Sequence, residues 1–520
     1  MIKNIKWLFF ASLIAVSCTQ DEVNYDEVEP EVIVSAGDAD FSKYVALGNS
    51  LTAGFSDGAL FIAGQNNAYP KLMADQFAQA GGGSFTIPLM NDNFGGLLLG
   101  GTPIQGVRLI FNGSAPVPLP GAAPTTEIIT PLTGPFNNLG VPGAKSFHLL
   151  ANGYGNVAGV AAGLANPYFV RFASSPSTSI VADAVAQNPT FFSLWIGNND
   201  VLSYATSGGT GTNQLGNLNP ATYGGNDITD PTVFATVYSN LVNALTANGA
   251  KGVVANIPYV NSVPFFTTVP TNPIAPALIP AASSAQLNQL FGAVNQITTA
   301  TGQPNRFVTL VSDDGNPATV EPNNPLLIID ESLPSLSAEI TAVLTPVLGA
   351  QTATFLGGLY GRARHARNTT GNADYILLTT RGVIGTNQAG VPAPFNVNGI
   401  SYPLQDNRVL TADEVAQVKT ATDAYNASIK AIADEKSLAF VDANALLTQL
   451  STSGIRFGNF HMTSSFVQGG AFGLDGIHLT ARGNAYIANK FMEAISAQYN
   501  SVFKMYKPEQ FPLSYPAILP

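Results

Sequence analysis

Short segments that lie far apart in the chain carry residue types that together could cleave an ester through a covalent acyl-enzyme. Ser50 lies in the segment Gly48-Asn49-Ser50-Leu51, directly after the short apolar run 44–47. A serine at the end of a buried strand is held rigidly, and flanking glycines let the chain turn sharply and let a substrate approach closely. Ser50 is therefore a candidate nucleophile, although similar glycine-serine turns also occur in ordinary loops.

A candidate base for this serine lies near the C-terminus, in Asp475-Gly476-Ile477-His478. In an Asp-x-x-His turn, the carboxylate can hold one imidazole nitrogen while the other nitrogen faces a serine hydroxyl. The spacing also occurs in loops without a catalytic role, but the chain has only 4 histidines. We therefore predict that His478 is the general base and that Asp475 orients it.

Two further segments could stabilise the negative charge that develops on the carbonyl oxygen. Asn199 follows the apolar run 189–196, and a side-chain amide at the carboxyl end of a buried strand suits an oxyanion donor. A strand-terminating turn is the other interpretation of this Asn-rich segment. Gly143 ends the segment 138–143 and could present its backbone N–H without an obstructing side chain, or it could be only a turn residue.

The order of these segments resembles the conserved blocks of the SGNH (GDSL-type) hydrolase superfamily. The resemblance implies a flavodoxin-like three-layer α/β/α sandwich with a parallel sheet. It also implies that Ser50 is the nucleophile, His478 the base and Asp475 its orienting acid. The N–H groups of Ser50 and Gly143 and the side chain of Asn199 would then form the oxyanion hole.

The chain departs from the family pattern at Asn49, where the family usually has Asp. That family residue is not the acid of the triad, so the change concerns local hydrogen bonding and pH response more than activity. The sequence between the blocks is also longer than in compact members of the family, so the resemblance does not specify the substrate.

Composition excludes several classes of function. The chain has 520 residues, of which 46% are hydrophobic and 11% are charged, and its net charge is −11. Nucleic-acid binding is not expected, because a phosphate backbone demands clustered Lys and Arg. The histidines and the single cysteine show no metal-ligand spacing, so we expect no metal and no cofactor.

The N-terminus has the pattern of a secretion signal. Lys3 and Lys6 precede the apolar stretch 7–16, which is too short to span a bilayer. The segment that ends at Cys18 resembles a bacterial lipobox, which implies a signal peptide at 1–17 and a lipidated Cys18. The alternative is a thiol that is lost with a cleaved leader. An acidic segment, 18–38, would follow as a flexible tether. We therefore expect a lipoprotein of the cell envelope, anchored to the outer membrane by lipid, with no transmembrane helix after residue 20.

The sequence after residue 38 predicts an α/β fold. Apolar runs at 44–47, 189–196, 251–257 and 438–441 predict strands, and the spacing of apolar residues predicts helices near 179–187, 234–247 and 484–498. A capping box, Thr411 to Glu414, predicts the start of another helix. Alternating strands and helices indicate a parallel sheet with helices on both faces. We assign 39–500 to this domain, with insertions at about 201–410 and a C-terminal tail at 501–520.

The insertions bear on the choice of substrate. Leu326–Ile329 and Leu336–Leu348 are apolar, and they favour an ester with an acyl chain, as a lipase would use. The basic cluster 362–367 could bind an anionic group or could be a solvated loop. Two other functions stay open: a carbohydrate O-acetyl esterase, and a surface binding protein that has lost activity on the same fold. The sequence leaves the oligomeric state open.

Overall fold

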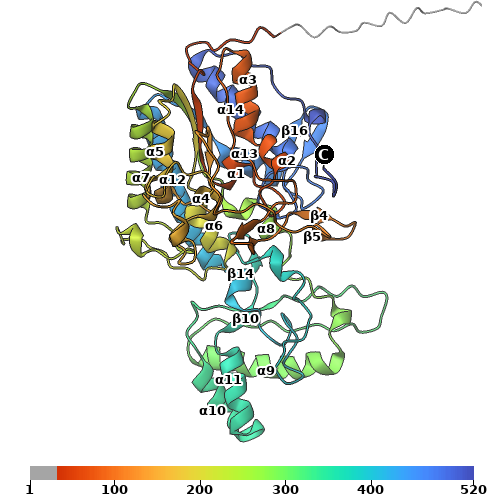
Figure 1. Ribbon diagram of the computed structural model, residues 1–520. Coiled ribbons are helices and arrows are strands. Elements are labelled where there is room, and N and C mark those ends of the chain that lie inside the picture. The colour runs from red at the N-terminus through yellow and green to blue at the C-terminus, as the bar shows by residue number, and fades with distance from the viewer. Residues whose placement is uncertain (1–31, 520) are drawn as a thin grey trace, which may run out of the picture. The chain divides into compact units, whose positions relative to one another are not determined.

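A parallel sheet of 5 strands organises the part of the chain that the computed structural model describes, residues 32–519 (Figure 1). Its order across the sheet is β15-β8-β7-β1-β6. The strands are β1 (Tyr44–Gly48), β6 (Asn138–Gly140), β7 (Phe191–Trp195), β8 (Lys251–Ala255) and β15 (Ala439–Val441). The expected signal peptide at 1–17, Cys18 and the tether as far as residue 31 lie outside the described residues.

The strands form where the sequence offers short apolar runs that are buried on both faces. All residues of β1 and β7 are buried, as expected for parallel strands covered by helices on both sides. In the register, Ala46 lies opposite Asn138 of β6 and Ser193 of β7. The sequence-based prediction of a parallel sheet is confirmed.

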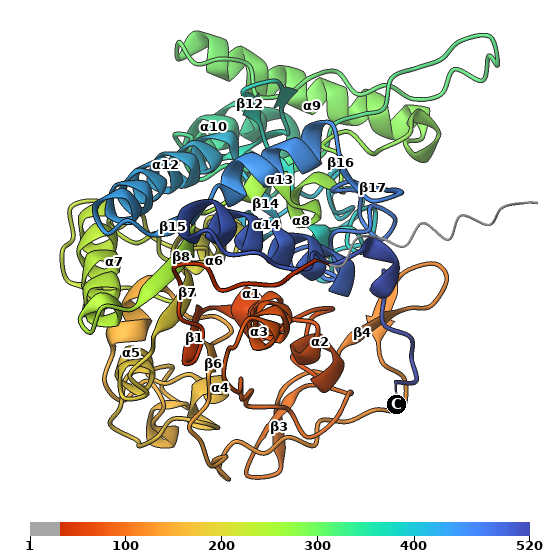
Figure 2. The ribbon, with the colours of Figure 1, turned by 90° about the horizontal axis from the view of Figure 1, so that it is seen from above.

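Helices flank both faces of the sheet, an arrangement compatible with a three-layer α/β/α fold. The helices α3 (Tyr69–Gln79) and α14 (Ala481–Tyr499) contact each other on one face, and α14 also contacts β8 and β15. The opposite face carries α5 (Ile180–Val185), α7 (Pro231–Thr246) and α12 (Ala412–Glu435). Figure 2 shows α3 and α14 on one side of the strands and α5 and α7 on the other.

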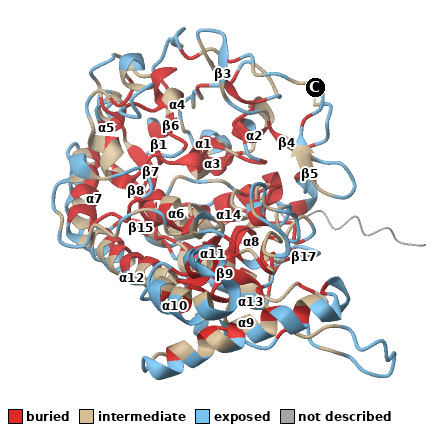
Figure 3. Cartoon of the chain, turned by 90° about the horizontal axis from the view of Figure 1, so that it is seen from below, coloured by how far each residue is buried: buried red, intermediate tan, exposed pale blue. Residues whose placement is uncertain are grey.

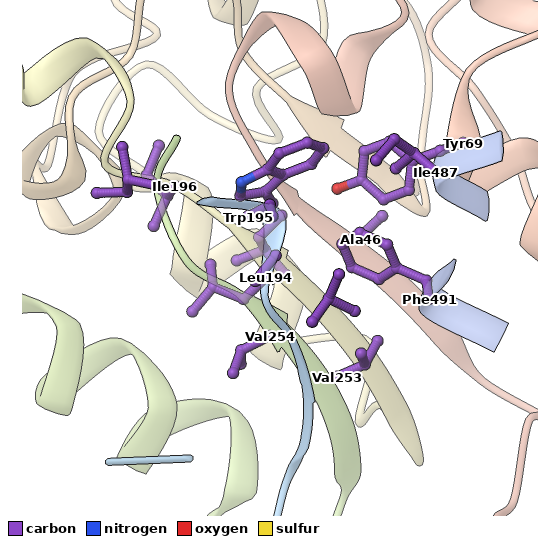
Figure 4. Packing of buried hydrophobic residues seen from close by; sticks show 14 of the residues in the cluster. Ala46, Tyr69, Leu194, Trp195, Ile196, Val253, Val254, Ile487 and Phe491 are labelled. Carbon is purple, nitrogen blue, oxygen red and sulfur yellow. The ribbon is translucent and has the colours of Figure 1, made fainter. Parts of the chain in front are cut away.

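Aromatic side chains fill the layer between the sheet and α14. Tyr69 and Phe491 stack on each other, and Trp195 of β7 packs against both, with ring centroids 5.6 and 5.8 Å away (Figure 4). Its neighbour Leu194 belongs to the opposite face, because successive side chains of a strand alternate. In Figure 3 the central strands are buried, whereas the outer helices are exposed on one side. This packing holds the strands in place, and with them the segments that follow β1 and β7.

The strand order creates a switch point between β1 and β7. The chain passes from β1 to β6 on one side, and then crosses to β7, β8 and β15 on the other. In doubly wound sheets, ligands bind outside the carboxyl ends of the strands at this point. Ser50 directly follows β1, and Asn199 follows β7, so both candidate residues lie at the place where the topology favours a binding site.

A second hydrophobic core lies within residues 269–409. It contains α9 (Ala281–Ala300), α10 (Ser337–Leu348), α11 (Ala350–Tyr360) and the paired strands β9 (Leu327–Ile329) and β10 (Ala363–His365). This range is narrower than the expected insertion at 201–410, because α7 and β8 belong to the main layers. The short strand β13 (Tyr375–Ile376) pairs with β14 (Val409–Leu410) and is followed by a 3-10 turn.

The expectation of a solvated loop for the basic cluster is wrong for Arg364 and His365, which are buried. The Arg364 guanidinium donates to Asp330 at 2.5 Å and to Asp374 at 2.6 and 2.8 Å. Arg364 and His365 therefore belong to the second core, where a buried cation is held by two carboxylates, whereas Arg362 is exposed.

Both ends of the described chain pack against the main core. Ser35, in the expected tether, pairs with Val502, and Asp38 donates its N–H to the Tyr499 carbonyl. Phe511 and Tyr515, in the expected tail, are buried. The last residues of the tether and the C-terminal segment are thus parts of the folded body.

The other elements are short. The helices are α1 (Ser50–Ala53), α2 (Ile62–Asn66), α4 (Pro167–Val170), α6 (Asn199–Thr206), α8 (Pro264–Thr267) and α13 (Ala443–Thr452). The strands are β2 (Leu97–Leu99), β3 (Thr102–Gln105), β4 (Leu109–Phe111), β5 (Pro116–Pro118), β11 (Asn368–Thr369), β12 (Asn372–Ala373), β16 (Ile455–Phe457) and β17 (Phe460–Met462). Within residues 32–519, no helix combines the length and apolarity that a membrane span requires.

Candidate active site

The structure brings Ser50, His478 and Asp475 together in one chain of hydrogen bonds. The Ser50 Oγ lies 2.8 Å from His478 Nε2, and His478 Nδ1 lies 2.9 Å from Asp475 Oδ2. Because an ionised carboxylate can only accept, the Nδ1–H of His478 donates to Asp475. This tautomer leaves Nε2 free to accept the hydroxyl proton of Ser50. The three groups therefore have the mutual geometry of an activated nucleophile.

Strand β1 and helix α1 position the candidate nucleophile. Ser50 is the first residue of α1 and its exposed fraction is 8%. The preceding residue, Asn49, caps this helix, since its Oδ1 accepts the Leu51 N–H at 3.1 Å. The buried strand and the capped turn together fix the direction of the Ser50 side chain.

A tight turn holds the acid and the base. Asp475 Oδ1 accepts the N–H groups of Ile477 and His478, both at 2.9 Å. Gly476 has a φ of +74°, and a β-carbon there would lie 3.0 Å from Phe265 N. Glycine is therefore required at this position, both for the left-handed backbone and for the close approach.

The environment of Asp475 keeps it ionised. Burial alone would raise the pKa of its carboxyl group. The charge of a protonated His478 and the hydrogen bonds from His478 and Ile477 outweigh burial and hold the Asp475 pKa well below its usual range. Asp475 is thus suited to orient the imidazole and to stabilise the imidazolium that forms when His478 takes a proton.

The two expected oxyanion donors also meet. Asn199 Nδ2 donates to the carbonyl of Ala144, next to Gly143, at 2.9 Å, and an amide carries a second N–H that can bind a ligand. Gly143 has a φ of +82°, which favours glycine there. Among the described residues, no acceptor pairs with the N–H of Ser50 or of Gly143. These unpaired donors and the Asn199 amide could together hold an oxyanion.

Asp200, which the sequence interpretation left without a role, fixes the loop that carries Gly143. Its carboxylate accepts the Ser146 N–H at 2.8 Å and the Ser146 hydroxyl at 2.7 Å. Asp200 is fully buried, and burial raises its pKa. Asn199 and Asp200 therefore hold the glycine loop from two adjacent positions of α6. The Asn-Asp pair after β7 is the only sequence signal for this role, and it also fits an ordinary turn.

The residue that departs from the family pattern has its own partner. Asn49 Nδ2 donates to Asn198 Oδ1 at 3.3 Å. An Asp at position 49 could cap α1 in the same way, but it could not donate to Asn198. The amide at position 49 thus links the segment that follows β1 to the segment that follows β7.

Residues 56–58 were not expected in the site, yet they hold the turn that carries Asp475 and His478. The Gly58 N–H donates to Asp475 Oδ2 at 2.9 Å, and the Ser56 hydroxyl donates to the Leu479 carbonyl at 3.0 Å. Asp57 Oδ1 accepts the Leu474 N–H at 2.7 Å, while Asp57 Oδ2 has no hydrogen-bond partner in the described part of the chain. Burial, together with a smaller contribution from the nearby charge of Asp475, raises the pKa of Asp57 to about 7. In the sequence, Ser-Asp-Gly indicates only a turn.

An apolar pocket of about 940 Å³, its open mouth included, lies beside the triad. Ser50, Asn199 and His478 form part of its wall, whereas Gly143 does not. The other walls come from the segment 257–263, α13, the β16–β17 hairpin and the first turns of α14. Leu326–Ile329 and Leu336–Leu348, on which the expectation of an acyl-chain ester depended, are not among the lining residues, because these segments pack in the second core or at its surface.

One group of side chains in the described part of the chain has the spacing of metal ligands. The carboxylates of Asp313, Asp314 and Glu321 lie within 4.8 Å of one another. They belong to a loop of the insertion, where Asp313 and Asp314 are exposed. They are not among the residues that line the pocket of Ser50, so the candidate chemistry of the site does not involve them.

Comparison with protein-family models, with characterised proteins and with solved structures found no match to the chain. The interpretation of the site therefore depends on its geometry and on the physical chemistry of its residues.

Proposed function

We propose that the chain is a serine hydrolase of carboxylic esters that works through an acyl-enzyme, and that it is an SGNH-type hydrolase. The observation that carries the proposal is the hydrogen-bonded series Ser50, His478, Asp475 at the switch point of the sheet. The strand order, taken in chain order as 2-1-3-4-5, is that of flavodoxin-like folds, and it supports the family expectation.

The residues define a two-step reaction. His478 Nε2 takes the proton of the Ser50 hydroxyl as Oγ attacks the ester carbonyl. The N–H groups of Ser50 and Gly143 and the amide of Asn199 bind the oxyanion. When the carbonyl re-forms, the bond to the alcohol breaks and His478 returns the proton to the leaving oxygen. Water, deprotonated by His478, then attacks the acyl-enzyme and releases the acid, and Ser50 regains its proton.

The pocket favours an ester with an acyl chain over a carbohydrate ester. Sugars require many hydrogen-bonding side chains, whereas most of the wall beside Ser50 is aliphatic. The pocket therefore supports an esterase of the lipase kind more than an O-acetyl esterase. The complete set of hydrogen-bonded catalytic groups speaks against the inactive binding protein.

The site of action is proposed from the sequence of the N-terminus alone. The apolar stretch 7–16 and Cys18 support a lipoprotein signal and a lipid anchor. We place the protein in the cell envelope, as an outer-membrane lipoprotein.

Labelling with a fluorophosphonate probe tests the proposed function. The full chain should be labelled, and Ser50→Ala should abolish both labelling and the hydrolysis of p-nitrophenyl esters. Ser177→Ala is the matched control, because Ser177 is an exposed serine outside the site, and it should behave like the wild type. Unchanged labelling of Ser50→Ala would refute the assignment of the nucleophile.

A further inference from the structure

The wall of the pocket beside Ser50 contains a continuous apolar stripe from α13. Ala443, Leu446, Leu447 and Leu450 all line the pocket, and their spacing places them on one face of a helix. Asp442 caps this helix, since its Oδ1 accepts the Ala445 N–H at 3.0 Å. The opposite side of α13 is exposed, so the helix presents its apolar face to the space beside the nucleophile.

The strand hairpin next to α13 continues this surface. Ile455 of β16 and Met462 of β17 are paired, and both are buried and line the pocket. Ile257 and Ile487 add aliphatic wall from the end of β8 and from α14. The side chains of this surface are aliphatic and carry no hydrogen-bonding groups, so burial of apolar area must supply most of the binding free energy.

The polar side chains of the wall either lie beside Ser50 or are bonded to residues outside the pocket. Among residues 32–519, no Asp, Glu, Lys or Arg side chain lines the pocket. The Tyr259 hydroxyl donates to Asp423, and the Tyr486 hydroxyl is hydrogen-bonded to the Lys490 side chain. A sugar or an anion would find few partners there, whereas an alkyl chain requires none.

We propose that this pocket binds the acyl chain of the substrate and that the apolar face of α13 sets the chain length that fits. The inference depends on the hydrolase function proposed above. The acyl group stays bonded to Ser50 after the alcohol leaves, and water must then reach the carbonyl from the vacated side. A chain held along α13 keeps the acyl-enzyme in place during this exchange, whereas an alcohol held there would have to leave past the carbonyl carbon.

The proposal predicts how the rate depends on chain length. Each methylene that moves from water into the pocket should raise kcat/KM about fourfold, until the pocket is full. From p-nitrophenyl acetate to the octanoate we therefore expect an increase of at least about 100-fold. Lengthening the alcohol of an acetate ester should change kcat/KM much less.

Two panels of esters on the full chain test which part of the substrate occupies the pocket. One panel varies the acyl chain of p-nitrophenyl esters, and the other varies the alcohol of alkyl acetates. A steep rise in the acyl panel alone supports the proposal. A steeper rise in the alcohol panel, or an acetate that reacts as fast as the octanoate, would overturn it while leaving the proposed hydrolase function intact. If no ester reacts and no probe labels Ser50, the hydrolase function itself fails.

Substitutions in α13 test whether its apolar face sets the length of the acyl chain that fits. Ala443→Phe fills the pocket and should lower the ratio of kcat/KM for octanoate over acetate by at least about tenfold. Ala445→Phe is the matched control, because Ala445 is an exposed alanine of the same helix that does not line the pocket, and its ratio should stay at the wild-type value.

Leu450→Ala enlarges the pocket and should move the optimum toward longer acyl chains. If Ala443→Phe does not fold, this variant and the two ester panels still decide the question. Equal chain-length profiles for the wild type and Leu450→Ala, or a profile of Ala443→Phe that matches that of Ala445→Phe, would contradict the role of α13.

Discussion

The buried carboxyl group of Asp57 gives a quantitative prediction for stability. Its exposed fraction is 2%, its Oδ1 accepts the Leu474 N–H, and its Oδ2 has no hydrogen-bond partner within residues 32–519. Burial raises the pKa of Asp57 to about 7 in the folded protein, whereas in an unfolded chain it would be about 3.9. The substitution Asp57→Asn removes this titration and keeps an oxygen that can accept the Leu474 N–H.

The magnitude follows from linkage. The folded-state pKa is raised, so folding favours the protonated carboxyl group. As pH rises from about 4 to about 7, the unfolded state loses its proton first and the free energy of unfolding falls. A shift of about 3 units corresponds to about 4 kcal/mol, lost in full above pH 7. Relative to the wild type, Asp57→Asn should therefore be about 4 kcal/mol more stable at pH 8 than at pH 4.

Urea unfolding of the wild type and Asp57→Asn between pH 4 and pH 8 measures this difference. Asp413→Asn is the matched control, because it makes the same substitution at an exposed carboxylate on α12. If Asp57→Asn changes the free energy of unfolding by the same amount at pH 4 and pH 8, Asp57 does not titrate as its burial requires, and the reasoning is refuted.

Other substitutions test the oxyanion hole, the link at position 49 and the second core. Asn199→Ala should lower kcat for p-nitrophenyl esters roughly 100- to 1000-fold and should cost about 1 kcal/mol in urea unfolding, because the Ala144 carbonyl loses its donor; a wild-type kcat would remove Asn199 from the oxyanion hole. Asn49→Asp should lower the free energy of unfolding by about 1 kcal/mol, because a carboxylate cannot donate to Asn198; equal stability in urea would contradict this link. Asp374→Asn should cost about 3 kcal/mol in urea unfolding, since the buried Arg364 loses a charged partner; a loss below about 0.5 kcal/mol would contradict that.

The local sequence was sufficient to predict most elements of the sheet layers. Strands β1, β7 and β8 are short apolar runs bounded by turn residues, and the capping box at Thr411 and Glu414 does open α12. The segments that hold Ser50 and Asn199 could be placed together in advance, because the carboxyl ends of parallel strands meet at one edge of a sheet.

Features that depend on contacts between distant segments could not be predicted in this way. Nothing near Arg364 in the sequence indicates that Asp330 and Asp374 surround it, so its cluster resembles a solvated loop. The contact of Gly58 with Asp475 likewise joins segments from opposite ends of the chain. Tertiary packing, which local patterns do not contain, decides both.

The segments that line the pocket could not be predicted from local sequence patterns either. Apolar residues in Leu336–Leu348 and in α13 have a similar helical spacing, but only α13 lies beside Ser50. Whether an apolar helix lines a pocket or covers a separate core depends on where the chain returns to the sheet. Helix α13 directly follows β15, so it begins at the carboxyl edge of the sheet where the nucleophile lies.

If Ser50 carries the acyl group during turnover, the acyl-enzyme can be trapped and the acylated residue located by mass mapping. The full chain would be mixed with p-nitrophenyl octanoate, quenched in acid within the first turnovers and digested. We predict an octanoyl adduct on the peptide that contains Ser50, and no adduct in Ser50→Ala. Steady hydrolysis by the wild type with no adduct on Ser50, or with the adduct on another residue, would show that Ser50 is not the nucleophile.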